Sequence, residues 1–300
     1  MRDRIIRELK KLTKHSYIEL TERGNTAIFA ALYCARKLVL DENYKIMKKT
    51  VIIPDQAGWL TYEKYPKMLE LEVKKVKTEH GIIDLDELKK ISKDACVFIY
   101  ANPAGYFAEQ PIREIYNICK NNNCLVILDV TGSIGDAELS DGSYADFIVC
   151  SFGRWKPVNL GYGGFISAAK KEYFEMSETQ RVSEHAQKSP IFDKAKEIFN
   201  TIHFDEKYLP LLEKKLSSLT RRLNLLYERA KKVKNDLKEL SIIHRDKKGI
   251  NVIVKFDGDE EKEKIINYCK NNNLEYTLCP RYIRVMDKAI SIEIKRLEVK

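Results

Sequence analysis

Three polar side chains in the middle of the chain are of types that can do chemistry together. Asp129 ends the apolar run Leu125–Leu128, Ser151 ends the run Phe147–Cys150, and Lys156 lies five residues further on. Both runs have the length and the β-branched content of buried strands. Because ligands of open α/β sheets bind outside the carboxyl ends of the strands, we expect a carboxylate, a hydroxyl and an amine to face one crevice.

These three groups suit pyridoxal 5'-phosphate (PLP). The aldehyde of PLP forms a Schiff base with a lysine, its ring nitrogen stays protonated beside a carboxylate, and its phosphate binds hydroxyls and backbone N–H groups. Lys156, Asp129 and Ser151 would supply these contacts in turn. A lone lysine is usually a solvated surface charge, but here a carboxylate and a hydroxyl accompany it. The residues therefore predict a PLP site.

The same segment resembles fold-type I PLP-dependent enzymes, and most closely the DegT/DnrJ-type aminotransferases that act on nucleotide sugars. The resemblance rests on the Ser-Phe-x-x-x-Lys pattern of Ser151–Lys156 and the Gly-x-Gly-Gly pattern of Gly161–Gly164. It implies that Lys156 is the Schiff-base lysine and that Asp129 pairs with the pyridinium nitrogen, which makes both of them catalytic.

Two glycines depart from the family pattern. Gly132 stands three residues after Asp129, where sugar aminotransferases usually carry Gln or His, and Gly153 stands where the family often has His. Thr131 or Ser133 is a candidate to replace the first of these side chains. The departures leave the reaction itself open.

Further cofactor contacts are predicted at the start of an apolar helix. Gly24, Asn25 and Thr26 open this helix, whose first turn presents backbone N–H groups and the positive end of the dipole. The resemblance implies that this turn holds the PLP phosphate. Taken alone, an Asn or Thr at such a position is an ordinary N-cap.

Two later segments complete the predicted cofactor site. Trp59 follows the expected strand Val51–Pro54, where the family has an aromatic residue that stacks on the pyridine ring; core packing is the alternative for Trp59. Asn102 follows the expected strand Cys96–Tyr100 in an Asn-Pro-x-Gly turn, which the resemblance places near the phenolic oxygen of the cofactor. Asn-Pro is also an ordinary turn signal.

The surrounding elements predict an α/β fold of the fold-type I PLP-dependent transferase class. Strands alternate with helices over the first 166 residues, which indicates a mostly parallel sheet flanked by helices. We expect a large domain over residues 1–240, including an N-terminal helix and one long connecting helix over Tyr208–Leu240. A small C-terminal α+β domain would span residues 241–300. In the family an arginine of this domain binds a substrate carboxylate, and Arg281 and Arg284 are the candidates.

Composition narrows the possible partners. The chain has 300 residues with 53 Lys and Arg against 44 Asp and Glu, a net charge of +9. Its lysines are scattered among glutamates, which indicates solvated faces rather than one binding stripe. The basic balance favours a phosphorylated, acidic substrate, and a nucleic-acid partner is the less favoured alternative. There is no apolar run of membrane-spanning length and no signal peptide, so we expect a cytoplasmic protein. Seven cysteines without a Cys-x-x-Cys pair predict reduced core thiols and no metal site.

Together these features predict a PLP-dependent aminotransferase that moves an amino group from a small-molecule donor to a keto acceptor through Lys156. A nucleotide-linked keto sugar is one candidate acceptor, and the resemblance implies a homodimer. The alternatives are another PLP reaction (a lyase, a decarboxylase or a substitution on an aminoacyl-tRNA) and a non-catalytic binding protein with this fold. The presence of Asp129, Ser151 and Lys156 argues against the second alternative, because binding alone does not require an amine at that position.

Overall fold

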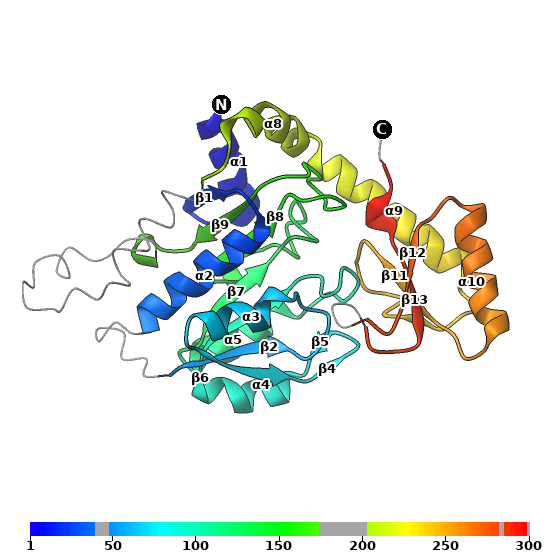
Figure 1. Cartoon of the computed structure of the whole chain (residues 1–300), viewed down its shortest axis with the longest axis horizontal. Coiled ribbons are helices and arrows are strands. Elements are labelled where there is room, and N and C mark those ends of the chain that lie inside the picture. The colour runs from blue at the N-terminus through cyan, green and yellow to red at the C-terminus, as the bar shows by residue number, and fades with distance from the viewer. Residues whose placement is uncertain (40–47, 174–202, 282–284, 299–300) are drawn as a thin grey trace, which may run out of the picture.

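The computed structural model describes residues 1–39, 48–173, 203–281 and 285–298. Its larger unit is built on a seven-stranded sheet with the order β1-β9-β8-β7-β6-β2-β3 (Figure 1). The strands are β1 (Tyr17–Thr21), β2 (Thr50–Pro54), β3 (Glu72–Val76), β6 (Ala95–Ala101), β7 (Leu125–Asp129), β8 (Phe147–Ser151) and β9 (Gly164–Ala168). Neighbouring strands from β8 to β3 pair in parallel, whereas β9 is antiparallel to both β1 and β8. The expected mostly parallel sheet is confirmed.

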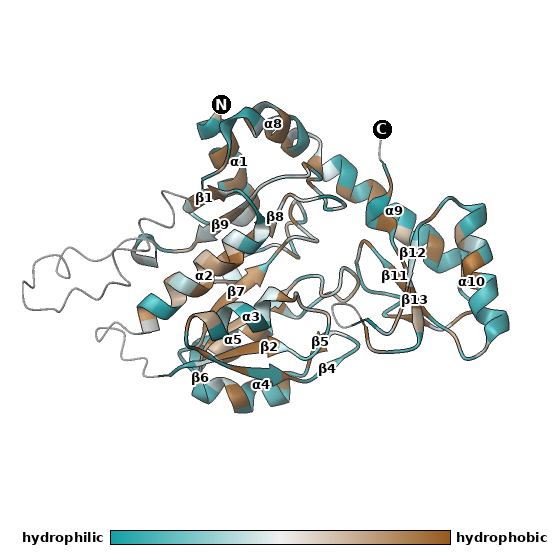
Figure 2. Cartoon of the chain, viewed as in Figure 1, coloured by the Kyte–Doolittle hydropathy of each residue, from teal (hydrophilic) through white to brown (hydrophobic). Residues whose placement is uncertain are grey.

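The central strands are apolar on both faces because helices cover both. In β7, Leu125 and Ile127 belong to one hydrophobic core, and Val126 and Leu128 belong to the core on the opposite face. This alternation follows from the two-residue period of a strand. Figure 2 agrees, since β2 and β7 are largely hydrophobic whereas α10 is largely hydrophilic.

Two groups of helices form the outer layers. Helices α2 (Gly24–Val39) and α3 (Thr61–Met68) pack on one face of the sheet. The opposite face is covered by α1 (Arg2–Thr13), α4 (Leu85–Ile91), α5 (Ile112–Asn121) and α8 (Leu209–Ser217). The remaining short elements are the hairpin of β4 (Thr78–Glu79) and β5 (Ile82–Ile83) and the 3₁₀ helices η2 (Ser92–Asp94), η3 (Gly142–Tyr144), η4 (Lys171–Tyr173), η5 (Glu206–Tyr208) and η6 (Ile294–Arg296). None of the helices in the described ranges has both the length and the apolar character that a bilayer crossing requires.

The C-terminal unit is a small antiparallel sheet with the order β10-β11-β13-β12. Its strands are β10 (Ile242–Ile243), β11 (Val252–Lys255), β12 (Tyr276–Leu278) and β13 (Ala289–Ile292). Helices α9 (Leu219–Asp236) and α10 (Asp259–Asn271) pack with it beside the larger unit (Figure 1). The expected small α+β domain is present.

The expected single helix over Tyr208–Leu240 is wrong, because two helices, α8 and α9, occupy this range and Ser218 separates them. The hydroxyls of Ser217 and Ser218 both donate to the carbonyl of Lys214, a local bond that competes with helix propagation. The apolar side of α9 then packs into the core of the small sheet. We therefore propose that the C-terminal domain begins near Ser218.

Candidate active site

A cavity of about 260 Å³ lies where the parallel strands end. The last residues of β6, β7 and β8 are Ala101, Asp129 and Ser151, and all three line it. The strand register explains this, since Ala101 pairs with Asp129 and Asp129 pairs with Val149. The N-terminus of α2 and residues of the C-terminal unit form further walls. The cavity therefore lies between the two units of the fold.

Most of the residues predicted from the sequence meet at this cavity. Those that line it are Gly24, Asn25, Trp59, Asp129, Ser151, Lys156 and Arg281. Thr26 and Asn102 are not among its lining residues, and Arg284 lies outside the described residues. Segments separated by more than a hundred residues in the sequence thus contribute to one site.

The carboxylate of Asp129 is held by two hydrogen bonds. Its Oδ2 accepts from the hydroxyl of Tyr62 at 2.7 Å, and its Oδ1 accepts from the backbone N–H of Thr131 at 2.9 Å. Burial, and after it the negative charge of Asp129, holds the pKa of Tyr62 well above its usual value, so the hydroxyl stays a donor. Tyr62 was not predicted from the sequence, because nothing local distinguishes it from other helical tyrosines.

The amine of Lys156 lies between two aromatic side chains. Its Nζ donates a hydrogen bond to the hydroxyl of Tyr106 and is 4.6 Å from the centroid of the Tyr106 ring. The centroid of the Trp59 ring lies 5.7 Å from the same Nζ. Tyr106 is a second site residue that sequence reasoning missed.

The start of α2 and the end of β8 touch each other. A Cβ atom added to Gly24 would lie 2.4 Å from the Cβ of Ser151, so only glycine fits here without displacement. The Oδ1 of Asn25 accepts a hydrogen bond from Trp59 Nε1 at 2.8 Å. Trp59 is partly buried and also packs against a hydrophobic core. Its ring is therefore oriented by α2 and exposed to the cavity on one side.

Asn102 makes its side-chain hydrogen bonds to the backbone of two neighbouring segments. Its side chain is fully buried, donates to the carbonyl of Leu139 at 2.7 Å and accepts from the backbone N–H of Gln110 at 3.0 Å. These bonds fix the loop that follows β6. Contacts of this kind are typical of an Asn-Pro turn.

The structure gives a physical reason for the glycine at 132. A Cβ atom at this position would lie 2.6 Å from Cδ1 of Tyr106, so the Tyr106 ring occupies the space that a larger residue would need. Thr131 lines the cavity and accepts from Ser151 N through its Oγ1 at 2.9 Å. Ser133 instead donates to the carbonyl of Asn102 and is buried.

Basic side chains line the cavity on the side of the C-terminal domain. They are Arg281, Lys295 and Arg296, and Arg154 of the larger unit joins them. The guanidinium carbon of Arg296 lies 4.5 Å from the centroid of the Trp155 ring, and its Nη1 pairs with Glu275 at 2.5 Å. Lys295 and Arg296 were missed because their place at the cavity depends on how the two domains meet.

Known proteins resemble this chain in fold. A model described as the MJ1341 family C-terminal domain matches residues 220–300, and no curated protein matches the sequence. Among solved structures, alanine–glyoxylate aminotransferase from Nostoc sp. shares 13% identity at a TM-score of 0.69, covering 97% of this chain and 80% of that one. 3-Amino-5-hydroxybenzoic acid synthase shares 12% identity at a TM-score of 0.68, covering 98% of this chain and 85% of that one. Serine palmitoyltransferase from Sphingomonas wittichii shares 10% identity at a TM-score of 0.65, covering 97% of this chain and 70% of that one. The chain has the fold-type I architecture of PLP-dependent transferases.

Proposed function

We propose that this protein binds PLP in the cavity between its two domains and transfers an amino group from a small-molecule donor to a keto acceptor. The observation that carries the proposal is the convergence of Lys156, Asp129 and the Gly24–Ser151 contact on one cavity at the carboxyl ends of β7 and β8. These groups differ in chemistry, and each matches a different part of PLP.

The residues present fit the cofactor. The first turn of α2 offers N–H groups without intrahelical partners, and no side chain separates Gly24 from Ser151, so a phosphate can approach both. Asp129 would hold the ring nitrogen, Trp59 would face the ring, and Lys156 would bind the aldehyde. When bound, PLP supplies an electron sink for the carbon next to the amino group.

The protein's own residues would then move and orient protons. Lys156 Nζ reaches into the cavity and would carry a proton to or from the substrate carbon. Asp129 keeps its position through Tyr62 and Thr131, so its charge stays directed at one point. Arg281 would bind an anionic group of the substrate, and a nucleotide-linked keto sugar is one acceptor of this type. We also propose a cytoplasmic homodimer.

The test is to reduce the PLP-treated protein with borohydride and to map the modified residue by mass spectrometry. We expect a visible absorption band that disappears on reduction and a pyridoxyl adduct on Lys156. Lys156→Ala should lose the band, the adduct and all turnover, whereas the exposed Lys207→Ala should keep them. An adduct elsewhere, or a colourless protein at saturating PLP, would sink the proposal.

A second candidate function is a PLP reaction other than amino transfer. Serine palmitoyltransferase, which is not named as an aminotransferase, shares this fold over 97% of the chain, so the fold alone does not select the reaction. Incubating the PLP form with single amino acids separates the two candidates. Amino transfer converts the cofactor to its amine form and releases a keto acid, whereas the alternatives leave the cofactor as the aldehyde.

A further inference from the structure

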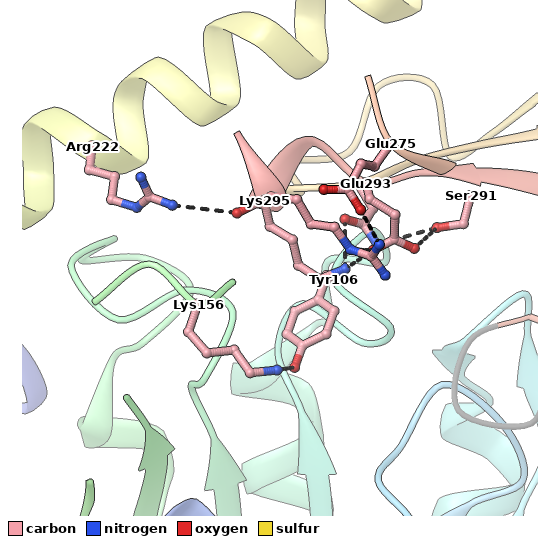
Figure 3. A network of polar contacts seen from close by, with 9 residues as sticks. Tyr106, Lys156, Arg222, Glu275, Ser291, Glu293 and Lys295 are labelled. Carbon is pink, nitrogen blue, oxygen red and sulfur yellow. Dashed lines mark hydrogen bonds and ion pairs between the residues drawn. The ribbon is translucent and has the colours of Figure 1, made fainter. Parts of the chain in front are cut away.

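Tyr106 lies between the amine of Lys156 and the C-terminal domain (Figure 3). Its hydroxyl accepts a hydrogen bond from Lys156 Nζ. The Nζ of Lys295 lies 4.9 Å from the centroid of the same ring. Both lysines line the cavity. One aromatic side chain therefore contacts two cavity lysines, one from each domain.

The backbone of Tyr106 is anchored by the C-terminal domain. Its φ of 73° is in the left-handed region, which costs energy for a residue with a bulky side chain. Its carbonyl accepts from the N–H groups of Ile250 at 2.8 Å and Asn251 at 3.1 Å, and both of these residues belong to the C-terminal domain. Such conformations persist where the surroundings over-determine them, and they concentrate at functional sites.

The ring has space to sit here because residue 132 is a glycine. A Cβ atom at Gly132 would be 2.6 Å from Cδ1 and 3.2 Å from Cε1 of Tyr106. Gly132 comes from the segment after β7, three residues beyond Asp129. The larger domain therefore leaves room for the ring, and the C-terminal domain anchors its backbone.

The group behind the ring is a buried charge pair. Lys295 is 2% exposed and its Nζ binds the carboxylate of Glu293 and, at 3.1 Å, the Oδ1 of Asn251. Glu293 in turn accepts from the hydroxyl of Ser291 at 3.0 Å. Figure 3 shows this network beside Tyr106. A buried pair whose partners are all hydrogen-bonded is a rigid support, because breaking it leaves a charge unpaired.

From these contacts we infer that Tyr106 is a positioning residue for Lys156, and that the Lys295–Glu293 pair sets its position. The hydroxyl holds the lysine amine at the cavity wall whenever the amine is not bound to a cofactor. The inference deepens the proposed function and rests on it for the meaning of Lys156, but its contacts exist in the protein alone.

The first experiment measures how fast the amine of Lys156 reacts in cofactor-free protein. A short pulse of formaldehyde with cyanoborohydride is followed by peptide mass spectrometry, and the rate is divided by that of the exposed Lys93 and Lys264. Tyr106→Phe keeps the ring but removes the acceptor, so Lys156 should react about fivefold faster, the factor expected for one hydrogen bond. Gly132→Ala should act in the same direction because it displaces the ring. An unchanged relative rate in Tyr106→Phe would overturn the inference.

The second experiment tests whether Lys295 acts through Tyr106. The double variant Lys295→Met/Glu293→Gln removes both charges of the pair, so neither charge is left buried without the other. It should change the Lys156 rate when Tyr106 is present and leave it unchanged in a Tyr106→Ala background. The exposed Lys231→Met is the matched control and should have no effect in either background. An equal change in both backgrounds would show that Lys295 does not act through Tyr106, and would overturn that part of the inference.

The labelling experiments test the positioning role of Tyr106 independently of the proposed function, because they need no PLP. A protein that never forms a Lys156 adduct but shows the Tyr106 effect would refute the cofactor proposal alone. A protein that binds PLP at Lys156 but labels at the same rate in Tyr106→Phe would refute the positioning role alone.

Discussion

Asp129 shows how a single charged side chain is made useful by its neighbours. A carboxylate that is 7% exposed requires hydrogen bonds, and Tyr62 and Thr131 supply them. Both donors approach from the protein and fix the plane of the carboxylate. Burial, and after it the charge of Asp129, raises the pKa of Tyr62, which keeps its hydroxyl in the form that donates.

Replacing Tyr62 by Phe should weaken both the fold and the site. It removes a donor to a charged group, so the free energy of unfolding should fall by about 1–3 kcal/mol. Tyr100→Phe is the matched control, since the Tyr100 hydroxyl is buried and has no hydrogen-bond partner among the described residues. Urea unfolding of both variants checks the prediction, and it would be contradicted if Tyr62→Phe were as stable as Tyr100→Phe.

At the scale of elements, the site depends on the contact between α2 and β8. Helix α2 begins at Gly24 against Ser151, the last residue of β8, and Thr131 bonds to both Asp129 and Ser151. A helix N-terminus, a strand end and a carboxylate are thus held in a fixed relation. The absence of a side chain at Gly24 is what permits the approach.

Gly24→Ala should therefore weaken PLP binding by about tenfold, equal to about 1.4 kcal/mol. The new methyl group would meet the Cβ and Cα of Ser151 at 2.4 and 3.0 Å, and neither atom belongs to a flexible side-chain end. Gly258→Ala is the control, because nothing lies within 4 Å of a Cβ there. Fluorescence titration with PLP tests this, and equal affinities for the two variants would count against the predicted phosphate position.

At the scale of the whole molecule, the N-terminal segment is tied to the sheet through His15. Its Nδ1 bonds to Ser167 Oγ at 2.9 Å, and its Nε2 lies 3.0 Å from the carbonyl of Gly142 and 3.2 Å from that of Ala145. Burial lowers the pKa of His15, more than the carbonyl contacts raise it. The folded protein therefore favours the neutral ring.

This shift predicts a loss of stability in acid. Below the unfolded-state pKa of about 6.5, the unfolded chain binds a proton at His15 more readily than the folded chain does. The free energy of unfolding should therefore fall by up to about 1.4 kcal/mol for each unit by which the pH is lowered. His15→Gln should remove that contribution, and the exposed His203→Gln should not. Urea unfolding at about pH 7.5 and about pH 5.5 measures the difference. The idea fails if His15→Gln loses as much stability on acidification as the parent protein.

The local patterns predicted the sheet and the strand ends that carry Asp129 and Ser151. Apolar runs of strand length and the helices between them are encoded within a few residues. These local patterns were therefore enough to predict a mostly parallel sheet and a C-terminal α+β unit. The prediction of one continuous helix over Tyr208–Leu240 was wrong, because side-chain hydrogen bonds from Ser217 and Ser218 to the backbone interrupt a sequence pattern that is otherwise periodic.

The sequence by itself determined which groups are available, namely an amine at Lys156, a carboxylate at Asp129 and the helix start at Gly24. The tertiary structure decided what holds them. Tyr62 and Tyr106 reach their partners across 67 and 50 positions of the chain, and such contacts depend on strand register and domain packing rather than on local spacing. The physical reason is that side-chain type and period are local properties, whereas burial and hydrogen-bond pairing are shared between distant segments and exist only once the chain has folded.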